Sequence, residues 1–350
     1  MGLALPGAND AAALFRQGVE LRGRGDLPGA LERFRRAASI NPAIPNIYRE
    51  IGLILIELRD FSAAADALRR AVRENASDFD SRYNLALSLA NGGRLEEAVR
   101  EARKLANDKP RWATAFYGLG HIYAMRGDRE AAAQALRTAA TLDSSLFRAW
   151  FELGKVLAEA GDREGAIEAF RNATRADPRS SAARYRLGVL LREAGEQSAA
   201  SAELSRAREL RDKRAKGEQA ASAYREGAER LDHGDFAGAV EALRRAANLR
   251  PDFGELRTAL ADAEEQWGWK LEQSGDLSSA LSHYQAAVAL APSARLHNHV
   301  GVLLAQTTQL DAAIESFRAA LALEPGFANA EKNLRQALEL QSAHSAQGRR

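Results

Sequence analysis

Side chains that carry out chemistry in enzymes are sparse in this sequence and are not arranged as catalytic sites. The 350 residues include no cysteine, which excludes disulfides, thiolate chemistry and cysteine zinc sites. Among the six histidines, His297 and His299 lie close together in the sequence. Residues two apart on a helix point to different faces, so we do not expect this pair to chelate a metal ion. The sequence predicts no metal site and no cofactor.

Motifs for nucleophilic and acid–base catalysis are missing as well. The sequence has no HExxH motif, no glycine-rich phosphate loop and no nucleophile elbow. Adjacent acidic residues, such as Glu96–Glu97 and Glu264–Glu265, are expected on solvated faces of helices. We therefore predict that the protein is not an enzyme and that it acts by presenting a surface.

Aromatic residues recur in the sequence at intervals of 34 residues. Each is followed two positions later by leucine and then at once by a small residue. The aromatics are Tyr83, Tyr117, Phe151 and Tyr185, the leucines Leu85, Leu119, Leu153 and Leu187, and the small residues Ala86, Gly120, Gly154 and Gly188. A self-similarity with this period is typical of an array of helix–turn–helix repeats.

The segment 147–180 shows which elements position these side chains. Apolar and small residues recur at helical spacing before and after Gly161–Asp162, which predicts two amphipathic helices. Gly161 is expected to end the first helix and Asp162 to begin the second. Pro178 is expected to mark the boundary to the next unit.

The pattern of aromatic, Leu-Gly, Gly-Asp, alanine, aromatic and proline in this segment resembles the tetratricopeptide repeat (TPR). The resemblance extends in register over most of the chain and implies an all-α fold. It implies a right-handed α-solenoid superhelix of about nine helix–turn–helix units with a C-terminal capping helix. Terminal caps of this kind are needed because the last repeat would otherwise expose its apolar face.

The repeat frame slips between the sixth and seventh units. The predicted organisation is an N-terminal tail (1–10), units one to six (11–212), a charged insertion (213–219), units seven to nine (220–327, with an extended helix near 254–260), a capping helix (328–341) and a disordered tail (342–350). The slip motivates the hypothesis that the array divides into two stacked subarrays, about 11–212 and 218–341.

The resemblance implies a concave groove lined by the first helix of each unit. The aromatic column lies on this side and extends to Phe15, Arg49 and Tyr224. An aromatic column could grip an extended peptide, or it could pack against the helix of the next unit, and both readings stay open. The candidate binding residues are Arg49, Tyr83, Asn84, Tyr117, His121, Phe151, Tyr185, Arg186, Tyr224 and Trp269.

Two binding codes known in this family do not fit. A carboxylate clamp for chaperone C-termini is matched by Arg49 and Asn84, but Leu53, Thr114 and Gly118 stand where it needs asparagine and two basic residues. An asparagine ladder would need asparagine throughout the column of Asn84, and Asn84 stands alone. Neither chaperone tails nor the substrates of sugar-transferring superhelices are expected.

Charge and hydropathy limit the partners. The net charge is +2, from 49 basic and 47 acidic residues, so no global field favours nucleic acid. The N-terminus lacks a signal peptide, and no apolar run is long enough to span a membrane. A cytoplasmic location is expected, or a periplasmic or secreted one if a leader has been removed. The abundance of arginine and alanine suggests a bacterial source.

The leading prediction is a non-catalytic scaffold or adaptor that binds a protein or an extended peptide in the groove. The alternative is a targeting or regulatory module of a larger enzyme, or of a secretion or cell-envelope assembly system. The sequence makes no prediction of oligomeric state.

Overall fold

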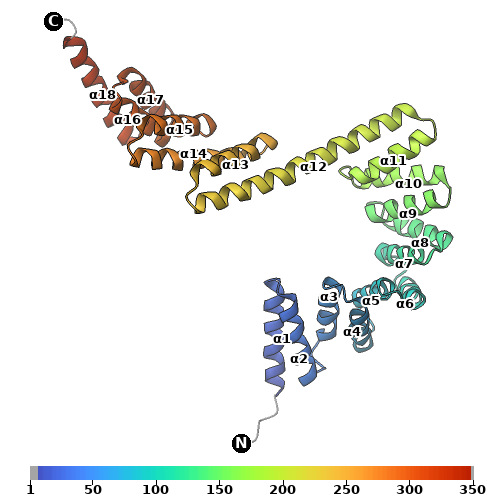
Figure 1. Cartoon of the computed structure of the whole chain (residues 1–350). Coiled ribbons are helices and arrows are strands. Elements are labelled where there is room, and N and C mark those ends of the chain that lie inside the picture. Colours follow the sequence, from blue (N-terminus) through green and yellow to red (C-terminus); the bar gives the residue numbers. More distant parts are fainter. Residues whose placement is uncertain (1–6, 348–350) are drawn as a thin grey trace, which may run out of the picture. The chain divides into compact units, whose positions relative to one another are not determined.

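The computed structural model describes residues 7–347, and these form α-helices joined by short turns, with no strand among them (Figure 1). The predicted all-α fold is confirmed. The helices are α1 (Ala8–Gly23), α2 (Leu27–Ile40), α3 (Ile47–Glu57), α4 (Phe61–Glu74), α5 (Phe79–Asn91), α6 (Leu95–Asp108), α7 (Ala113–Arg126), α8 (Arg129–Leu142), α9 (Phe147–Glu159), α10 (Arg163–Ala176), α11 (Ser181–Glu193), α12 (Gln197–Asp232), α13 (Phe236–Leu249), α14 (Gly254–Gln273), α15 (Leu277–Leu290), α16 (Ala294–Gln306), α17 (Leu310–Leu323) and α18 (Ala328–Gln347).

The turn inside each hairpin follows from two residues, as α9 and α10 illustrate. Gly161 adopts φ +82°, a left-handed conformation that glycine takes without steric cost, and α9 ends just before it. Asp162 then caps α10, its carboxylate accepting a hydrogen bond of 2.9 Å from the backbone N–H of Gly165. Both predicted signals are confirmed.

The two helices of a hairpin cross closely at a small residue. A Cβ atom on Gly120 would lie 2.6 Å from Cγ of Leu136 in α8 and 3.1 Å from the carbonyl oxygen of Ala132. Gly154 has the same relation to the Phe170 ring in α10, at 2.9 Å. Leu136 and Phe170 are fully buried, so the predicted close approach of the two helices is confirmed.

Helix α12 runs without a break from Gln197 to Asp232, and Figure 1 draws it as one ribbon. The expected insertion 213–219 lies inside it. No residue between Gly195 and Gly234 has a positive φ, and the stretch holds no proline, so nothing ends the helix. Ion pairs one helical turn apart support its exposed middle, namely Arg206 with Glu209 and Arg214 with Glu218.

The chain separates into two compact units, Met1–Leu210 and Arg211–Arg350, with α12 contributing to both. Because α12 supplies both a second and a first helix of the repeat frame, the count of nine units stays a prediction, as does the handedness of the superhelix. The first unit has its largest apolar cluster around α5–α9, and the second around α15–α17.

The ends of the helical array differ from the predicted boundaries. Helix α1 begins at Ala8, inside the expected tail 1–10, and α18 extends to Gln347, six residues beyond the expected capping helix. Residues 342–347, expected to be disordered, are therefore helical, because no helix-breaking residue follows position 341 before the glycine at 348. Residues 1–6 and 348–350 of the predicted tails lie outside the described residues. No helix within 7–347 is long and apolar enough to cross a membrane.

Candidate functional site

The aromatic column lies on the first helices of successive hairpins. Tyr83 is on α5, Tyr117 on α7 and Phe151 on α9. Helix α5 contacts α7, and α7 contacts α9, so these three side chains lie on neighbouring helices of one unit. We call the group formed by Tyr83, Tyr117 and Phe151, together with Arg148 and Glu152, the ladder site.

Tyr83 lies across the next first helix at Gly118. A Cβ atom at Gly118 would come within 2.6 Å of Cε2 of the tyrosine ring, so only glycine leaves room for it. The ring also contacts Trp112, with centroids 6.0 Å apart. Burial raises the pKa of Tyr83 to about 12, with a smaller contribution from Tyr117, while Arg148 opposes the shift.

Tyr117 stacks on His121, with ring centroids 6.1 Å apart and an angle of 20° between the planes. Burial raises its pKa, and the nearby carboxylate of Glu152 adds to this. Nδ1 of His121 is buried and has no hydrogen-bond partner within the part of the chain that the structure describes. An orphaned polar atom of this kind needs an explanation, and a bound partner is one.

Phe151 is the most core-like member of the column. Its ring meets Phe170 edge-on at 5.6 Å and stacks on Phe147 at 5.4 Å. Near it, Nζ of Lys155 lies 3.0 Å from a carboxylate oxygen of Glu152. Phe151 is therefore compatible with both packing and ligand binding. Its side chain packs against its own hairpin and is still only partly buried.

The hydrogen bonding of their hydroxyl groups distinguishes the tyrosines of the column from the other tyrosines of the protein. Every tyrosine outside the column has a partner for its hydroxyl: Tyr48 accepts from Arg70 (3.4 Å), Tyr123 from Arg103 (2.5 Å), and Tyr284 donates to Glu272 (3.0 Å). Within residues 7–347, no hydrogen bond involves the hydroxyls of the four column tyrosines, Tyr83, Tyr117, Tyr185 and Tyr224. These four hydroxyls are free to bond a ligand.

Three further candidates are aromatic side chains that are well exposed. Tyr185 is 57% exposed, Tyr224 42% and Trp269 54%, whereas Tyr83 and Tyr117 are half-buried. Asn84 and Arg186 make no hydrogen bond or ion pair with the rest of the described chain. Tyr224 and Trp269 belong to the second unit, so the ten predicted residues do not form one site within a compact unit.

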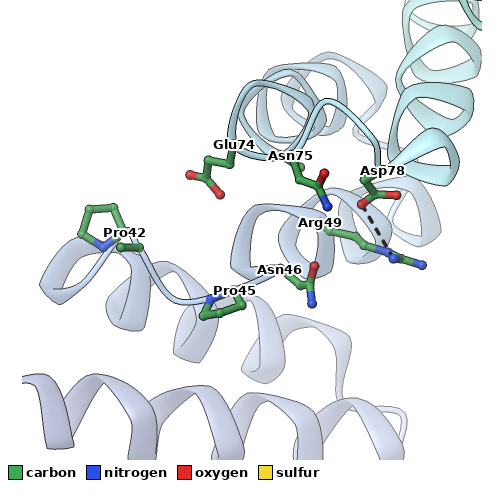
Figure 2. A pocket seen from close by; sticks show the side chains of 9 residues that line it. Pro42, Pro45, Asn46, Arg49, Glu74, Asn75 and Asp78 are labelled. Atoms are coloured by element: carbon green, nitrogen blue, oxygen red, sulfur yellow. Dashed lines mark ion pairs between the residues drawn. The ribbon is translucent and has the colours of Figure 1, made fainter.

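Arg49 occupies the same column, but its side chain lines a cavity outside the ladder site. Its guanidinium lies 3.7 Å from the carboxylate of Asp78, the residue that caps α5 (Figure 2). Both side chains line a cavity of about 550 Å³ between the α2–α3 and α4–α5 turns. Glu74, on the same cavity, points away from this pair in Figure 2. The ion pair ties Arg49 to the N-terminus of α5.

The expected position of Glu264 on a solvated face is wrong. Glu264 in α14 is 1% exposed. One carboxylate oxygen accepts a hydrogen bond of 2.8 Å from Arg244, and the other lies 2.7 Å from Nδ1 of His283, whose ring contacts Trp267 with the ring centroids 3.8 Å apart and the planes tilted by 33°. The partners come from α13 and α15, and they stabilise a carboxylate that would otherwise be too costly to bury. No group of three or more potential metal ligands occurs in the described chain.

The burial of Tyr83 makes a testable prediction. A raised pKa means that folding favours the neutral phenol, so its contribution to stability is complete below pH 10 and is lost as the pH rises through about 12. Subtracting the ultraviolet absorbance titration of Tyr83→Phe from that of the wild type should isolate a phenol with a midpoint near pH 12. A midpoint near the ordinary value of 10.0 would show that the ring is solvated.

Comparison with known proteins gives matches along most of the chain. Family models described as tetratricopeptide repeat match residues 15–78, 49–110, 113–146, 151–218 and 266–326. The BBSome complex member BBS4 homolog of Drosophila melanogaster is 31% identical over 74 residues, which are 21% of this chain and 15% of that protein. The chain thus spans a small part of that relative.

Two of the solved structures with similar folds each cover about half of the chain. A crystal structure of MamA has 25% identity and a TM-score of 0.44, covering 47% of this chain and 97% of that one. TTC0263, a protein of Thermus thermophilus, has 22% identity and a TM-score of 0.41, covering 52% and 98%. The family models match well over half of the residues. The protein belongs to the tetratricopeptide repeat family.

Proposed function

We propose that the protein is a non-catalytic scaffold whose ladder site holds an extended segment of a partner protein. Tetratricopeptide repeats generally mediate protein–protein interaction. The observation that carries the proposal is the set of free hydroxyls on Tyr83 and Tyr117, in a protein whose tyrosines outside the column use theirs for internal bonds. A peptide offers a carbonyl oxygen at every residue, and the partly buried rings supply apolar contact.

Charges beside the rings agree with a peptide ligand. Arg148 acts on both tyrosine hydroxyls and has no ion-pair partner within the described residues, while Glu152 is paired with Lys155. Charges of both signs next to aromatic faces suit a polypeptide better than a polyanion.

The test separates binding from packing. Alanine at Tyr117 or Phe151 would remove core contacts as well as ligand contacts, because both rings pack against the apolar clusters. Replacing Tyr83 and Tyr117 together by phenylalanine removes only two hydroxyls that have no internal bond. We expect unchanged thermal stability and about tenfold weaker binding of peptides selected from a displayed random library on the full-length protein.

Tyr123→Phe is the matched control. It removes the hydroxyl that accepts from Arg103, so we expect a loss of about 1 kcal/mol in the free energy of unfolding and unchanged affinity for the same peptides. A library that yields no peptide, or peptides that bind the Tyr83→Phe/Tyr117→Phe protein as tightly as the wild type, would contradict the proposal.

A further inference from the structure

The second unit contains a separate pocket, where the middle of α12 faces the turn between α13 and α14. Its volume is about 370 Å³. Ala220 and Leu256, which are 2% and 8% exposed, form its apolar floor. Tyr224 and Phe253, exposed by 42% and 44%, also line it, so two aromatic faces are available to a ligand.

Contacts of Arg250 with Phe253 and Asp252 fix the side of the pocket that Phe253 forms. The Arg250 guanidinium lies over the Phe253 ring, 5.2 Å from its centroid. The same guanidinium makes two hydrogen bonds to Asp252, of 2.9 and 3.1 Å. A Cβ atom at Gly217 would come within 3.3 Å of Nη1 of Arg250, so the glycine leaves the space that this arrangement needs. The pocket is therefore preorganised on this side.

Charged residues give the pocket a small excess of cations. Arg225 lines it and has no ion-pair partner in the described part of the chain. Lys213 lies one helical turn before Gly217 on the same face of α12, and it is close enough to Asp252 to help lower the pKa of that carboxyl, to which Arg250 contributes most. Of the charged residues that line the pocket, Arg225 and Arg250 are cations and Glu255 is an anion. Arg250 is paired with Asp252, which leaves Arg225 and the nearby Lys213 against Glu255.

We propose that this pocket takes an apolar side chain from an extended acidic segment of a partner protein. The apolar floor and the rings of Tyr224 and Phe253 receive the side chain, and carboxylates on neighbouring positions of the segment meet Arg225 and Lys213. A cavity of about 370 Å³ is at the small end for ligand sites, which suits a single anchoring side chain. The site uses none of the ladder residues of the first unit, so it does not depend on the proposed function.

The carboxylates beside the pocket favour a peptide over a nucleic acid. Bases could also stack on Tyr224 and Phe253. Asp252 and Glu255 would then face closely spaced phosphates, whereas an acidic peptide can place its carboxylates away from them. Electrostatic complementarity therefore favours a peptide whose carboxylates lie opposite the cations of the pocket.

The experiment selects short random peptides on the full-length protein by display and measures their affinities by fluorescence anisotropy. One class should carry Phe, Leu or Met next to Asp or Glu. Tyr224→Ala and Arg225→Glu should each weaken this class about tenfold or more. Arg257→Glu is the matched control, because Arg257 is exposed on α14, has no ion-pair partner in the described chain and does not line the pocket. It should change the affinity less than twofold.

The same peptides tested on the Tyr83→Phe/Tyr117→Phe protein separate the two sites. Unchanged affinity there assigns the peptides to the second unit, even if the ladder site binds nothing. The inference is overturned if no such class is selected, if its members lack carboxylates, or if Arg257→Glu weakens them as much as Arg225→Glu. It is also overturned if a short single-stranded DNA binds more tightly than the peptides and loses affinity on Tyr224→Ala.

Discussion

Replacing Gly120 by leucine is expected to destabilise the first unit by about 3 kcal/mol, since overpacking a close helix crossing forces its backbones apart. A Cβ atom there would meet the buried Leu136 side chain at 2.6 Å and the Ala132 carbonyl oxygen at 3.1 Å. The carbonyl belongs to a helix backbone and cannot move aside. Urea denaturation followed by circular dichroism measures the loss.

Gly118→Leu, two residues earlier in α7, is the matched control with the opposite outcome. The three atoms nearest to its Cβ atom would all belong to the ring of Tyr83, the end of a side chain and not a backbone. The better helix propensity of leucine, worth about 1 kcal/mol, offsets the lost ring contacts, so stability should change little. Peptide binding at the ladder site should weaken about tenfold, because the ring is displaced and its place is filled. If Gly118→Leu destabilises the protein as much as Gly120→Leu, Tyr83 is a fixed core residue and the ladder only packs.

The difference between Gly120 and Gly118 shows which packing contacts can be predicted from the sequence and which cannot. Gly120 stands in a column of small residues that repeats at 34-residue intervals, so its role in helix packing can be predicted from spacing alone. Gly118 falls in a column that holds asparagine, glutamate and arginine in other units, so nothing in the pattern shows that it accommodates Tyr83. The fit of Tyr83 against Gly118 is particular to one pair of neighbouring repeats, so only the three-dimensional structure shows it.

The middle of α12 marks another limit. The loss of repeat register near 213–219 is visible in the sequence, and it predicts an irregularity there. Both a new turn and a continuous helix fit that pattern, because the stretch has good helix formers and a single glycine at position 217. The ion pairs of Arg206 with Glu209 and Arg214 with Glu218 favour the continuous helix that is observed. The pocket at Gly217 could not be predicted, because its other wall comes from residues 250–256.

The repeat pattern does not predict which charged residues are buried. Glu264 and Glu265 are adjacent and chemically identical, yet Glu264 is fully buried and Glu265 is partly buried and paired with the exposed Arg295. The partners of Glu264 are 20 and 19 residues away, on α13 and α15. Only the packing of these helices on α14 brings them together.

Glu264→Ala is expected to reduce the stability of the second unit by about 2 kcal/mol, less than the full cost of breaking a buried ion pair. Arg244 is 57% exposed and regains water, so most of the loss comes from His283 and from the space that the side chain leaves. Urea unfolding followed by tryptophan fluorescence suits the measurement, because the ring of Trp267 contacts His283.

Glu265→Ala provides the comparison for this loss. The Glu265 side chain is 19% exposed, but its partner Arg295 is 68% exposed, so water screens the ion pair and it should contribute no more than about 1 kcal/mol. Glu264→Gln should lie between the two alanine variants, because the amide keeps the packing and one acceptor but not the charge. Equal losses for Glu264→Ala and Glu265→Ala would mean that Arg244 and His283 do not depend on Glu264. In that case the carboxylate is hydrated, and the three helices are held by their apolar contacts alone.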